Sequence, residues 1–371
     1  MTVIFLLCLS APCAYAIVIW ETELVDSTGG TGRTLSMALD STNQPVIAFG
    51  RYNVGLFYVS RNGGSWGSIE EVDASGNMGG INLVMDGNDP MIAYTYSGEV
   101  RYIEKNGTWG SSQKIDDGNT DMKAMALDPD NGNPAITYGY VQYAAWNGSS
   151  WDIENFDGGQ GNNSLAFNNT GDPQIAYRKF VDGNYKLHYI EHNGTSWDSP
   201  VNVDTSAAKT VLPSLAVDSS TGNPAISYWD ETNGNLKYAW YDSGWQTPEI
   251  VDGNGDLVGT NSFLVMDSEG NPHITYTNIT TSSLMYAEKI GGAWNIQTVV
   301  SGGVSQDYVS MAIDESTGNY LIAYRGNGLF LATGTNVPEP STVVMMGVLL
   351  GGGWFVYRRK SKRPALNMDH Y

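Results

Sequence analysis

Three arginines stand at the same place in three internal copies of a repeat, where their chemistry is suited to holding an acidic group. Arg51, Arg178 and Arg325 each lie just past an aromatic residue that closes an apolar run. Guanidinium groups bind carboxylates through paired hydrogen bonds, so the three could converge on one acidic ligand. The interpretation that we prefer is three solvated loop residues. Trp229, in a loop of another copy, offers a surface on which a sugar ring could stack.

Other residue types with catalytic or ligand-holding chemistry form no recognisable constellation. The four histidines, His188, His192, His273 and His370, match no catalytic or metal-binding spacing, and the chain has no glycine-rich phosphate loop or serine elbow. The stretch 252–256, Asp-Gly-Asn-Gly-Asp, begins like a calcium loop, but Leu257 and Phe263 occupy positions where glycine and glutamate are expected. We therefore expect no cofactor, with calcium as the remaining alternative, and no catalytic residue.

A repeat of four short alternating runs positions these residues. The second run closes on an aromatic residue in seven copies: Phe49, Tyr94, Tyr138, Tyr177, Tyr228, Tyr276 and Tyr324. The fourth run opens on tryptophan in six copies: Trp66, Trp109, Trp151, Trp197, Trp245 and Trp294. Alternating runs between turn residues predict β-strands, so the fold class is all-β.

The offset between the two series predicts how the repeats assemble. The seventh copy ends after three runs, and the missing fourth run stands in front of the first copy, in Trp20 to Asp26. This arrangement predicts a seven-bladed β-propeller, residues 17–335, whose ring is closed by an N-terminal strand. An open β-solenoid is the alternative, but it gives no reason for an orphan last strand at the front.

Repetition also separates structural residues from candidates for recognition. An aspartate precedes the first turn in most copies, and we expect it to bond the turn backbone. These residues are Asp40, Asp86, Asp128, Asp218, Asp267 and Asp314. We expect the tyrosine and tryptophan series to pack one blade on the next. Loops on the opposite face vary between copies, and recognition is expected there.

An enzyme on the same scaffold is the alternative function. The turns that end in Gly-x-Trp or Gly-x-x-Trp distantly resemble the Asp-box turns of sialidase-like propellers, which implies a glycan-active enzyme such as a glycosidase or lyase. The Asp242–Trp245 turn is too short for that box, and the other turns lack its aspartate. We therefore expect a binding or scaffolding protein rather than an enzyme.

Charge restricts the partners of residues 17–335. The chain holds 19 basic and 39 acidic residues, and without the five basic and two acidic residues of its tail the formal charge is near −23. A surface so acidic argues against nucleic acid as a partner.

Both ends of the chain predict export. Residues 1–16 combine an apolar segment with the small-x-small pattern of Ala14 to Ala16, which predicts a signal peptide cleaved after Ala16, although no basic residue precedes the apolar segment. The 17 uncharged residues Ser341–Tyr357 would rise about 26 Å as a helix, enough for a short membrane span. The basic cluster Arg358–Arg363 should stay cytoplasmic.

The C-terminal pattern resembles a known sorting signal. Pro338-Glu339-Pro340, the apolar span and the basic tail, residues 336–363 followed by a cytoplasmic end at 364–371, are similar to the PEP-CTERM signal of Gram-negative bacteria. The resemblance implies that an exosortase-type enzyme processes an inner-membrane-anchored precursor. It further implies delivery to the cell surface or the extracellular matrix, in association with exopolysaccharide or a surface protein.

Overall fold

The computed structural model describes residues 17–76, 78–117, 122–156, 159–206 and 209–337. The described residues contain the strands β1 to β30 and no helix. The chain divides into two units, residues 21–333 and residues 1–20 with 334–371. The described part of the second unit comprises only the ends of β1 (Ile17–Asp26) and β30 (Leu329–Val337).

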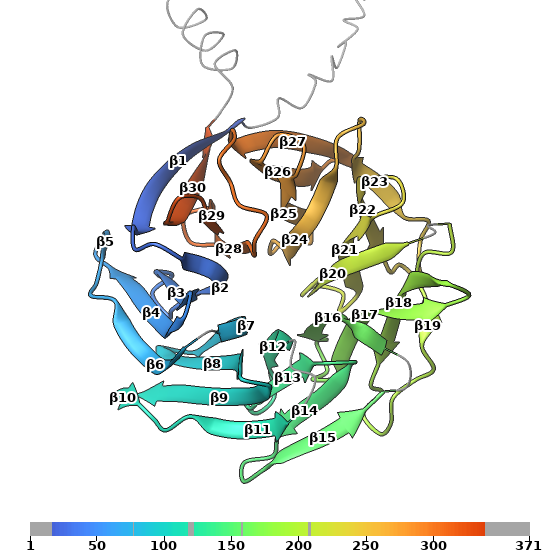
Figure 1. Cartoon of the computed structure of the whole chain (residues 1–371). Coiled ribbons are helices and arrows are strands. Elements are labelled where there is room, and N and C mark those ends of the chain that lie inside the picture. The colour runs from blue at the N-terminus through green and yellow to red at the C-terminus, as the bar shows by residue number, and fades with distance from the viewer. Residues whose placement is uncertain (1–16, 77, 118–121, 157–158, 207–208, 338–371) are drawn as a thin grey trace, which may run out of the picture. The chain divides into compact units, whose positions relative to one another are not determined.

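Seven antiparallel sheets, the blades, stand around a common centre (Figure 1). Blade 6 shows the plan: β24 (Val258–Met266) is innermost, followed outward by β25 (Pro272–Asn278), β26 (Ser283–Ile290) and β27 (Ala293–Val300). All seven residues of β25 are buried, because this strand has blades on both sides. Each blade is thus a short meander whose second strand forms the core.

The other blades follow the same order from the centre outward. Blade 1 contains β2 (Thr31–Leu39), β3 (Pro45–Arg51), β4 (Val54–Asn62), β5 (Ser65–Trp66) and β6 (Glu70–Gly76). Blade 2 contains β7 (Met78–Asp86), β8 (Asp89–Tyr96), β9 (Glu99–Asn106), β10 (Thr108–Trp109) and β11 (Gln113–Asp117). Blade 3 contains β12 (Met122–Leu127), β13 (Pro134–Tyr138), β14 (Gln142–Trp146) and β15 (Trp151–Asn155).

Blades 4 and 5 lie between blades 3 and 6 (Figure 1). Blade 4 contains β16 (Gly159–Phe167), β17 (Pro173–Val181), β18 (Asn184–Glu191) and β19 (Val201–Asn202). Blade 5 contains β20 (Thr210–Val217), β21 (Pro224–Asp230), β22 (Asn235–Trp240) and β23 (Glu249–Asp252).

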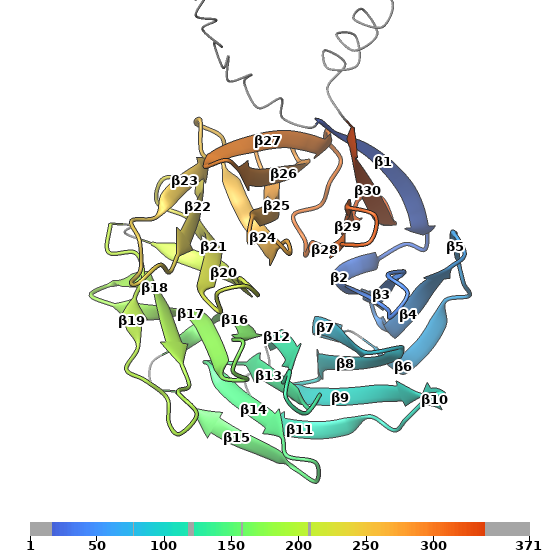
Figure 2. The same cartoon turned by 180° about the vertical axis from the view of Figure 1, so that it is seen from behind.

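Blade 7 confirms the predicted ring closure. Its strands run in the order β28 (Ser310–Asp314), β29 (Asn319–Arg325), β30 and β1, so the N-terminal strand supplies the outermost position (Figure 2). Closure pairs the first strand of the described residues with the last and gives blade 7 four strands, as in blades 3 to 6. An open solenoid is therefore excluded.

The fourth run is less regular than the sequence predicts. In blades 1 and 2 the tryptophan lies in a two-residue strand, β5 or β10, and a second strand, β6 or β11, continues the pairing. In blades 4 and 5, Trp197 and Trp245 make single bridges, and Pro200 and Pro248 follow them. Proline has no N–H to donate to a ladder, which explains the interruption there.

Ring contacts between neighbouring blades confirm the predicted packing role of the tryptophan series, but the partners are third-strand tyrosines that lie outside the predicted tyrosine series. In five junctions the fourth-run tryptophan of one blade meets the third-strand tyrosine of the preceding blade edge to face, with centroids 5.0–5.3 Å apart. The pairs are Trp109–Tyr58, Trp151–Tyr102, Trp197–Tyr143, Trp245–Tyr189 and Trp294–Tyr238. Edge-to-face contacts add to the stability gained by burying the rings.

A second interblade contact, which we call the latch, was not predicted. An aspartate near the end of the fourth strand accepts a hydrogen bond from the tyrosine that closes the second strand of the next blade. The pairs are Asp73–Tyr94, Asp116–Tyr138, Asp204–Tyr228 and Asp252–Tyr276. Burial, reinforced by the facing carboxylate, raises the pKa of each tyrosine, so the phenol remains the donor. The repeated apolar-Asp pair, as in Val72-Asp73 and Val251-Asp252, is the sequence signal that could have revealed it.

Candidate functional site

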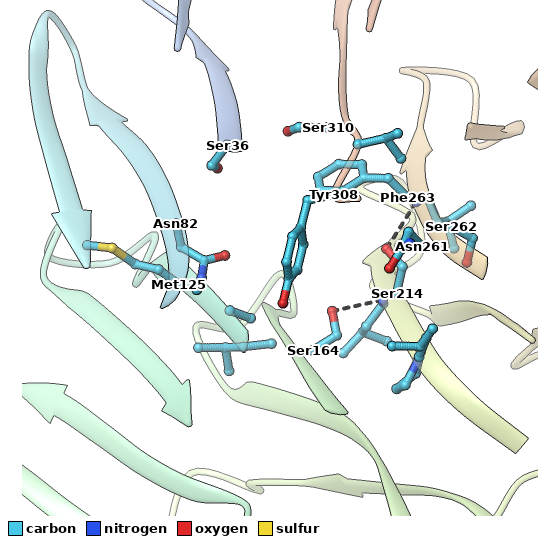
Figure 3. Close-up of a pocket in the computed structure, with 18 of the residues that line it drawn as sticks. Ser36, Asn82, Met125, Ser164, Ser214, Asn261, Ser262, Phe263, Tyr308 and Ser310 are labelled. Carbon is cyan, nitrogen blue, oxygen red and sulfur yellow. Dashed lines mark hydrogen bonds between the residues drawn. The ribbon is translucent and has the colours of Figure 1, made fainter. Parts of the chain in front are cut away.

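A cavity of about 220 Å³ lies where the innermost strands of all seven blades meet. Its wall includes residues of β2, β7, β12, β16, β20 and β24, together with Tyr308, Val309 and Ser310 at the entrance to β28. Figure 3 shows Tyr308 extending from blade 7 into the space between these strands. The cavity is thus a property of the closed ring and belongs to no single blade.

The cavity wall is polar but uncharged. Among the residues that line it, hydroxyl groups come from serines and Tyr308, and amides come from four asparagines: Asn82, Asn162, Asn163 and Asn261. No lysine, arginine, aspartate or glutamate lines it. Such a wall matches a neutral ligand with hydroxyl groups better than it matches an ion.

Four of the serines connect neighbouring blades. Each serine oxygen accepts a hydrogen bond from a backbone N–H of the next innermost strand, at 3.0–3.1 Å. The pairs are Ser310–Met37, Ser36–Leu83, Ser164–Leu215 and Ser214–Leu264, and the last two bonds are visible in Figure 3. Innermost strands of different blades do not form a ladder, so these N–H groups need another acceptor. The four serines are therefore structural.

Asn163 is the polar residue of the wall that the fold leaves unsatisfied. Its side chain is 4% exposed, and neither Oδ1 nor Nδ2 has a hydrogen-bond partner among the described residues. A buried amide without partners costs free energy, and native structures rarely keep one without a reason. Asn163 is among the residues that line the cavity, and its amide carries one acceptor and one donor group without a partner among the described residues.

Exposed aromatic side chains are found on the same face as the mouth of the cavity. We call this the loop face: it carries the connections between second and third strands and those that enter each innermost strand. Tyr52, Tyr140 and Phe180 lie in or beside the former connections, and Tyr308 in the latter. Their exposed fractions are 37–57%. The sequence does not distinguish these residues, because a single exposed aromatic residue has no distinctive spacing.

The three candidate arginines lie on the loop face, but the structure gives each a local polar partner. Arg51 binds Asp26 through Nε at 3.0 Å and Nη2 at 2.9 Å, and Arg325 pairs with Asp307. With the Asn162 amide oriented so that Oδ1 faces Arg178, that oxygen accepts from Nε at 3.1 Å and Nη1 at 2.9 Å. The guanidinium groups therefore do not meet on one shared acceptor of the chain.

Arg51 takes part in closing the ring. The Asp26 side chain, at the end of β1, is buried and also accepts from the Thr28 and Thr31 hydroxyls at 2.8 Å. Burial by itself would raise the pKa of this carboxyl, but the hydrogen bonds from Thr28, Thr31 and Arg51 outweigh it and lower the pKa. Because Phe49 has no hydroxyl, Arg51 replaces the tyrosine of the latch at this junction.

Trp229, the fourth candidate, lies in β21 beside the entrance to β20. Its backbone is paired with Val211 and Leu236, and its side chain is half-buried. The indole Nε1 is buried without a partner among the described residues. A partly exposed ring at this place keeps Trp229 available as a stacking surface.

The remaining sequence predictions concern the ends of the chain and metals. The motif Pro338-Glu339-Pro340, the predicted span and the signal peptide lie outside the described residues. Within the described ranges, no helix has the length and apolarity of a membrane span, and no group of three or more metal-ligating side chains is found. In the stretch 252–256, Asp252 and Asp256 accept hydrogen bonds from Tyr276 and Asn278.

Comparison with solved structures finds a similar fold in AofleA. AofleA from Arthrobotrys oligospora superposes with a TM-score of 0.50 at 11% identity, covering 76% of this chain and 90% of that one. A variant of the Aleuria aurantia lectin in complex with Fucalpha1-6GlcNAc gives a TM-score of 0.48 at 14% identity, covering 76% and 98%. At such low identity the similarity concerns the fold alone.

Sequence comparison identifies the C-terminal segment. No curated protein matches the chain. The PEP-CTERM protein-sorting motif matches residues 336–360, which confirms the resemblance seen in Pro338-Glu339-Pro340 and the residues after it. The motif implies an exported, exosortase-sorted protein. The chain is therefore a seven-bladed β-propeller protein that carries a PEP-CTERM protein-sorting motif.

Proposed function

We propose that the propeller is an extracellular binding module that holds an uncharged carbohydrate at the mouth of the central cavity. Its role is to attach the protein to exopolysaccharide at the cell surface or in the extracellular matrix. The observation that carries the proposal is Asn163, a buried amide with both of its polar groups unpaired in a wall that has no charge. Sugar hydroxyls both donate and accept, so one sugar unit satisfies both groups.

Exposed aromatic residues on the loop face support a carbohydrate over other neutral ligands. Tyr308 projects into the cavity, and Tyr52, Tyr140 and Phe180 stand on the loop face outside it. The apolar C–H face of a sugar packs on such rings while its hydroxyls reach polar groups. A polysaccharide longer than the cavity would then contact several blades.

The cavity wall favours binding over catalysis. Glycoside hydrolysis generally uses a pair of carboxyl groups flanking the scissile bond. No carboxylate lines this cavity. We therefore propose no catalytic role for the site.

Binding of neutral polysaccharides to the purified propeller tests the proposal. A glycan array selects a ligand, and titration calorimetry then compares variants. We expect Asn163→Leu and Tyr308→Ala each to weaken binding at least about tenfold, or about 1.4 kcal/mol. Asn106→Ala, on the opposite face, is the matched control and should leave the affinity unchanged. Equal affinity in all three variants, each with an unchanged melting temperature, would refute the site.

The four sequence candidates are proposed as secondary contacts on the rim. Trp229→Ala should weaken binding without introducing salt dependence, since stacking is nearly indifferent to ionic strength. Arg178→Ala should weaken the binding of an acidic polysaccharide and reduce its sensitivity to salt. Arg51 and Arg325 are less suitable for a first test, because their loss removes the counter-charges of Asp26 and Asp307. If the affinity for a neutral ligand fell steeply with salt, this would contradict the assignment of stacking to Trp229 and of charge recognition to Arg178.

Sorting is tested separately in the native host. We propose that an exosortase-type enzyme of a Gram-negative bacterium recognises Pro338-Glu339-Pro340 and releases the propeller from the inner membrane, where Ser341–Tyr357 anchors the precursor. Replacing the three residues with alanine should leave the protein in the inner-membrane fraction. Release of the altered protein at the wild-type level would remove the motif from the sorting step.

A further inference from the structure

An ion pair recurs at three junctions between blades. A glutamate three residues before the latch position in one blade faces a basic residue at the end of the third strand of the next blade. The pairs are Glu23–Arg61 at 2.9 Å, Glu70–Lys105 at 2.7 Å and Glu249–Lys289 at 2.7 Å. The two glutamates that face lysines also accept the indole N–H of Trp109 or Trp294, at 2.9 Å.

In the two lysine junctions the ammonium group sits among aromatic rings. Nζ of Lys105 lies 5.4 Å from the Tyr58 ring centroid and 5.5 Å from that of Trp109. Nζ of Lys289 lies 4.7 Å from the Trp240 centroid and 5.8 Å from that of Trp294. Cations within about 6 Å of a ring centroid are attracted by its electron-rich face. The junction is therefore a built ammonium site that the chain fills with its own lysine.

The junction between blades 4 and 5 keeps the aromatic pair but lacks the ion pair. Tyr189 and Trp245 meet at 5.0 Å, as the equivalent rings do elsewhere. Val201 stands where Glu70 and Glu249 stand, and Tyr241 stands where the lysines stand. A cavity of about 370 Å³ lies at this junction, on the face opposite the loop face, and no basic residue lines it.

Negative charge in this cavity comes from Glu191 and Asp198. Glu191 accepts hydrogen bonds from the Tyr189 hydroxyl at 3.0 Å, Asn168 Nδ2 at 3.0 Å and Gln174 Nε2 at 3.1 Å, all of them neutral. No ion pair to Glu191 is found among the described residues. Three neutral donors hold the carboxylate in place without neutralising it.

Gln174 gives an independent indication of a ligand. It lines the cavity, its side chain is 1% exposed, and its Oε1 has no hydrogen-bond partner among the described residues. The equivalent position in blades 3 and 5 is alanine, Ala135 or Ala225. A buried carbonyl oxygen without a donor, beside an uncompensated carboxylate, suits a ligand that brings N–H groups.

We propose that the cavity between blades 4 and 5 binds a protonated amino sugar, whose ammonium group takes the place that Lys105 and Lys289 occupy at the two lysine junctions. The ammonium is held by Glu191, Asp198 and the rings of Trp245 and Tyr241, and it donates to Gln174 Oε1. Tyr241 is 37% exposed and stands nearly perpendicular to Trp245, at 83°, so its free side offers a surface for the sugar ring. The volume of the cavity exceeds what an ammonium group alone requires and leaves room for that ring.

Calorimetric or NMR titration of the propeller with glucosamine tests the proposal, with N-acetylglucosamine as the neutral match. We expect glucosamine to bind, and N-acetylglucosamine to bind at least tenfold more weakly, because acetylation removes the charge. Affinity for glucosamine should fall as salt is raised. Equal binding of the two sugars would overturn the proposal.

Two variants separate a lost site from a damaged fold. Glu191→Gln should weaken glucosamine binding at least tenfold, whereas Glu104→Gln, which alters the equivalent carboxylate beside Tyr102 in blade 2, should not. The double change Val201→Glu with Tyr241→Lys supplies the missing internal pair. It should abolish binding without lowering the melting temperature, and retained binding would overturn the proposal.

Two further measurements delimit the ligand and the site. Tighter binding of Nα-acetyl-lysine methylamide than of glucosamine would overturn the assignment to a sugar in favour of a peptide. Binding of neutral polysaccharide at the central cavity should be unchanged in the double variant, so the two sites fail independently.

Discussion

The face opposite the loop face, which we call the turn face, carries the same aspartate–backbone hydrogen bond in five blades. Asp40, Asp128, Asp218, Asp267 and Asp314 each accept a hydrogen bond from the backbone N–H two residues ahead, at 2.8–3.0 Å. These bonds confirm the structural role predicted for five of the six aspartates; the sixth, Asp86, pairs with Asp89 across a two-residue hairpin instead. Loops on the other face share no such pattern: Arg51 closes the ring, Arg178 faces Asn162, and Arg325 pairs with Asp307.

The difference teaches where to look for recognition in a repeat protein. A group that recurs in every blade serves packing, because the same requirement recurs at every junction. A position where one blade departs from the repeat does not have to meet this packing requirement. Asn163 in the cavity wall stands where other blades carry apolar residues such as Leu35 and Ile81. The Val201 and Tyr241 pair between blades 4 and 5 departs from the ion pair found at three junctions, and it lies on the turn face.

Deleting Ile17–Asp26 should have the largest effect on stability, because it removes a complete junction between blades. Blade 7 loses its outer strand, and Arg51 loses the buried carboxylate that it binds. We expect unfolding to be favoured by more than about 4 kcal/mol, with aggregation through the exposed strand edge. Melting and light scattering measure it. Leu24→Thr, at an exposed position of the same strand, is the control, and equal behaviour of the two proteins would contradict ring closure by β1.

Asp204→Ala tests a single latch. Asp204 is fully buried and binds both the Tyr228 hydroxyl at 2.6 Å and the Lys237 ammonium. Its loss leaves a buried ammonium without a counter-charge, so we expect a cost of about 3–5 kcal/mol in urea unfolding. Asp218→Ala, which frees only an exposed turn, should cost about 1 kcal/mol. Similar losses in the two variants would show that junctions and turns contribute equally.

Acidification should remove the stability contributed by the carboxyl groups whose pKa is lowered in the folded state, which are Asp26, Asp204, Asp218, Asp267 and Asp314. Burial would raise the pKa of Asp267, but hydrogen bonds from His273 and Asn271 lower it to about 2, and the pKa of Asp204 is lowered as well. Folded-state values below the unfolded value of about 4 stabilise the protein above that pH and cease to do so as the pH falls through the folded values. The melting temperature should therefore decrease from about pH 5 to pH 2. Asp204→Asn should show a shallower decrease.

Ser36→Ala should have the smallest effect of these changes on stability, and it tests the bridging role of the serines directly. The Leu83 N–H loses the acceptor that bridges blades 1 and 2, and we expect a loss of about 1 kcal/mol in urea unfolding. Blade 3 carries Ala124 at the equivalent position, so Ala124→Ser should cost nothing or stabilise slightly. A larger loss from Ala124→Ser than from Ser36→Ala would contradict the bridging role of these serines.

The sequence by itself determined the architecture, because its signals are local and repeated. Alternating runs, turn residues and the displaced fourth run at Trp20 to Asp26 specify seven blades and their closure without any knowledge of distant contacts. The sorting motif can also be recognised from the sequence alone, because Pro338-Glu339-Pro340 and the residues after it are contiguous. The domain boundaries proposed at residues 16 and 335 stay predictions.

Only the tertiary structure decided which side chains serve ligands and which serve the fold. Arg51 looks free in the sequence, but its partner, Asp26, arrives from the strand that closes the ring. Asn163 and Ser164 are adjacent polar residues. Only the hydrogen bonds between blades show that the Ser164 hydroxyl has a partner, whereas the Asn163 amide has none among the described residues. Val201 and Tyr241 lie forty residues apart and form one cavity because neighbouring blades pack side by side. Contacts between repeats depend on the closed ring, and no local pattern encodes them.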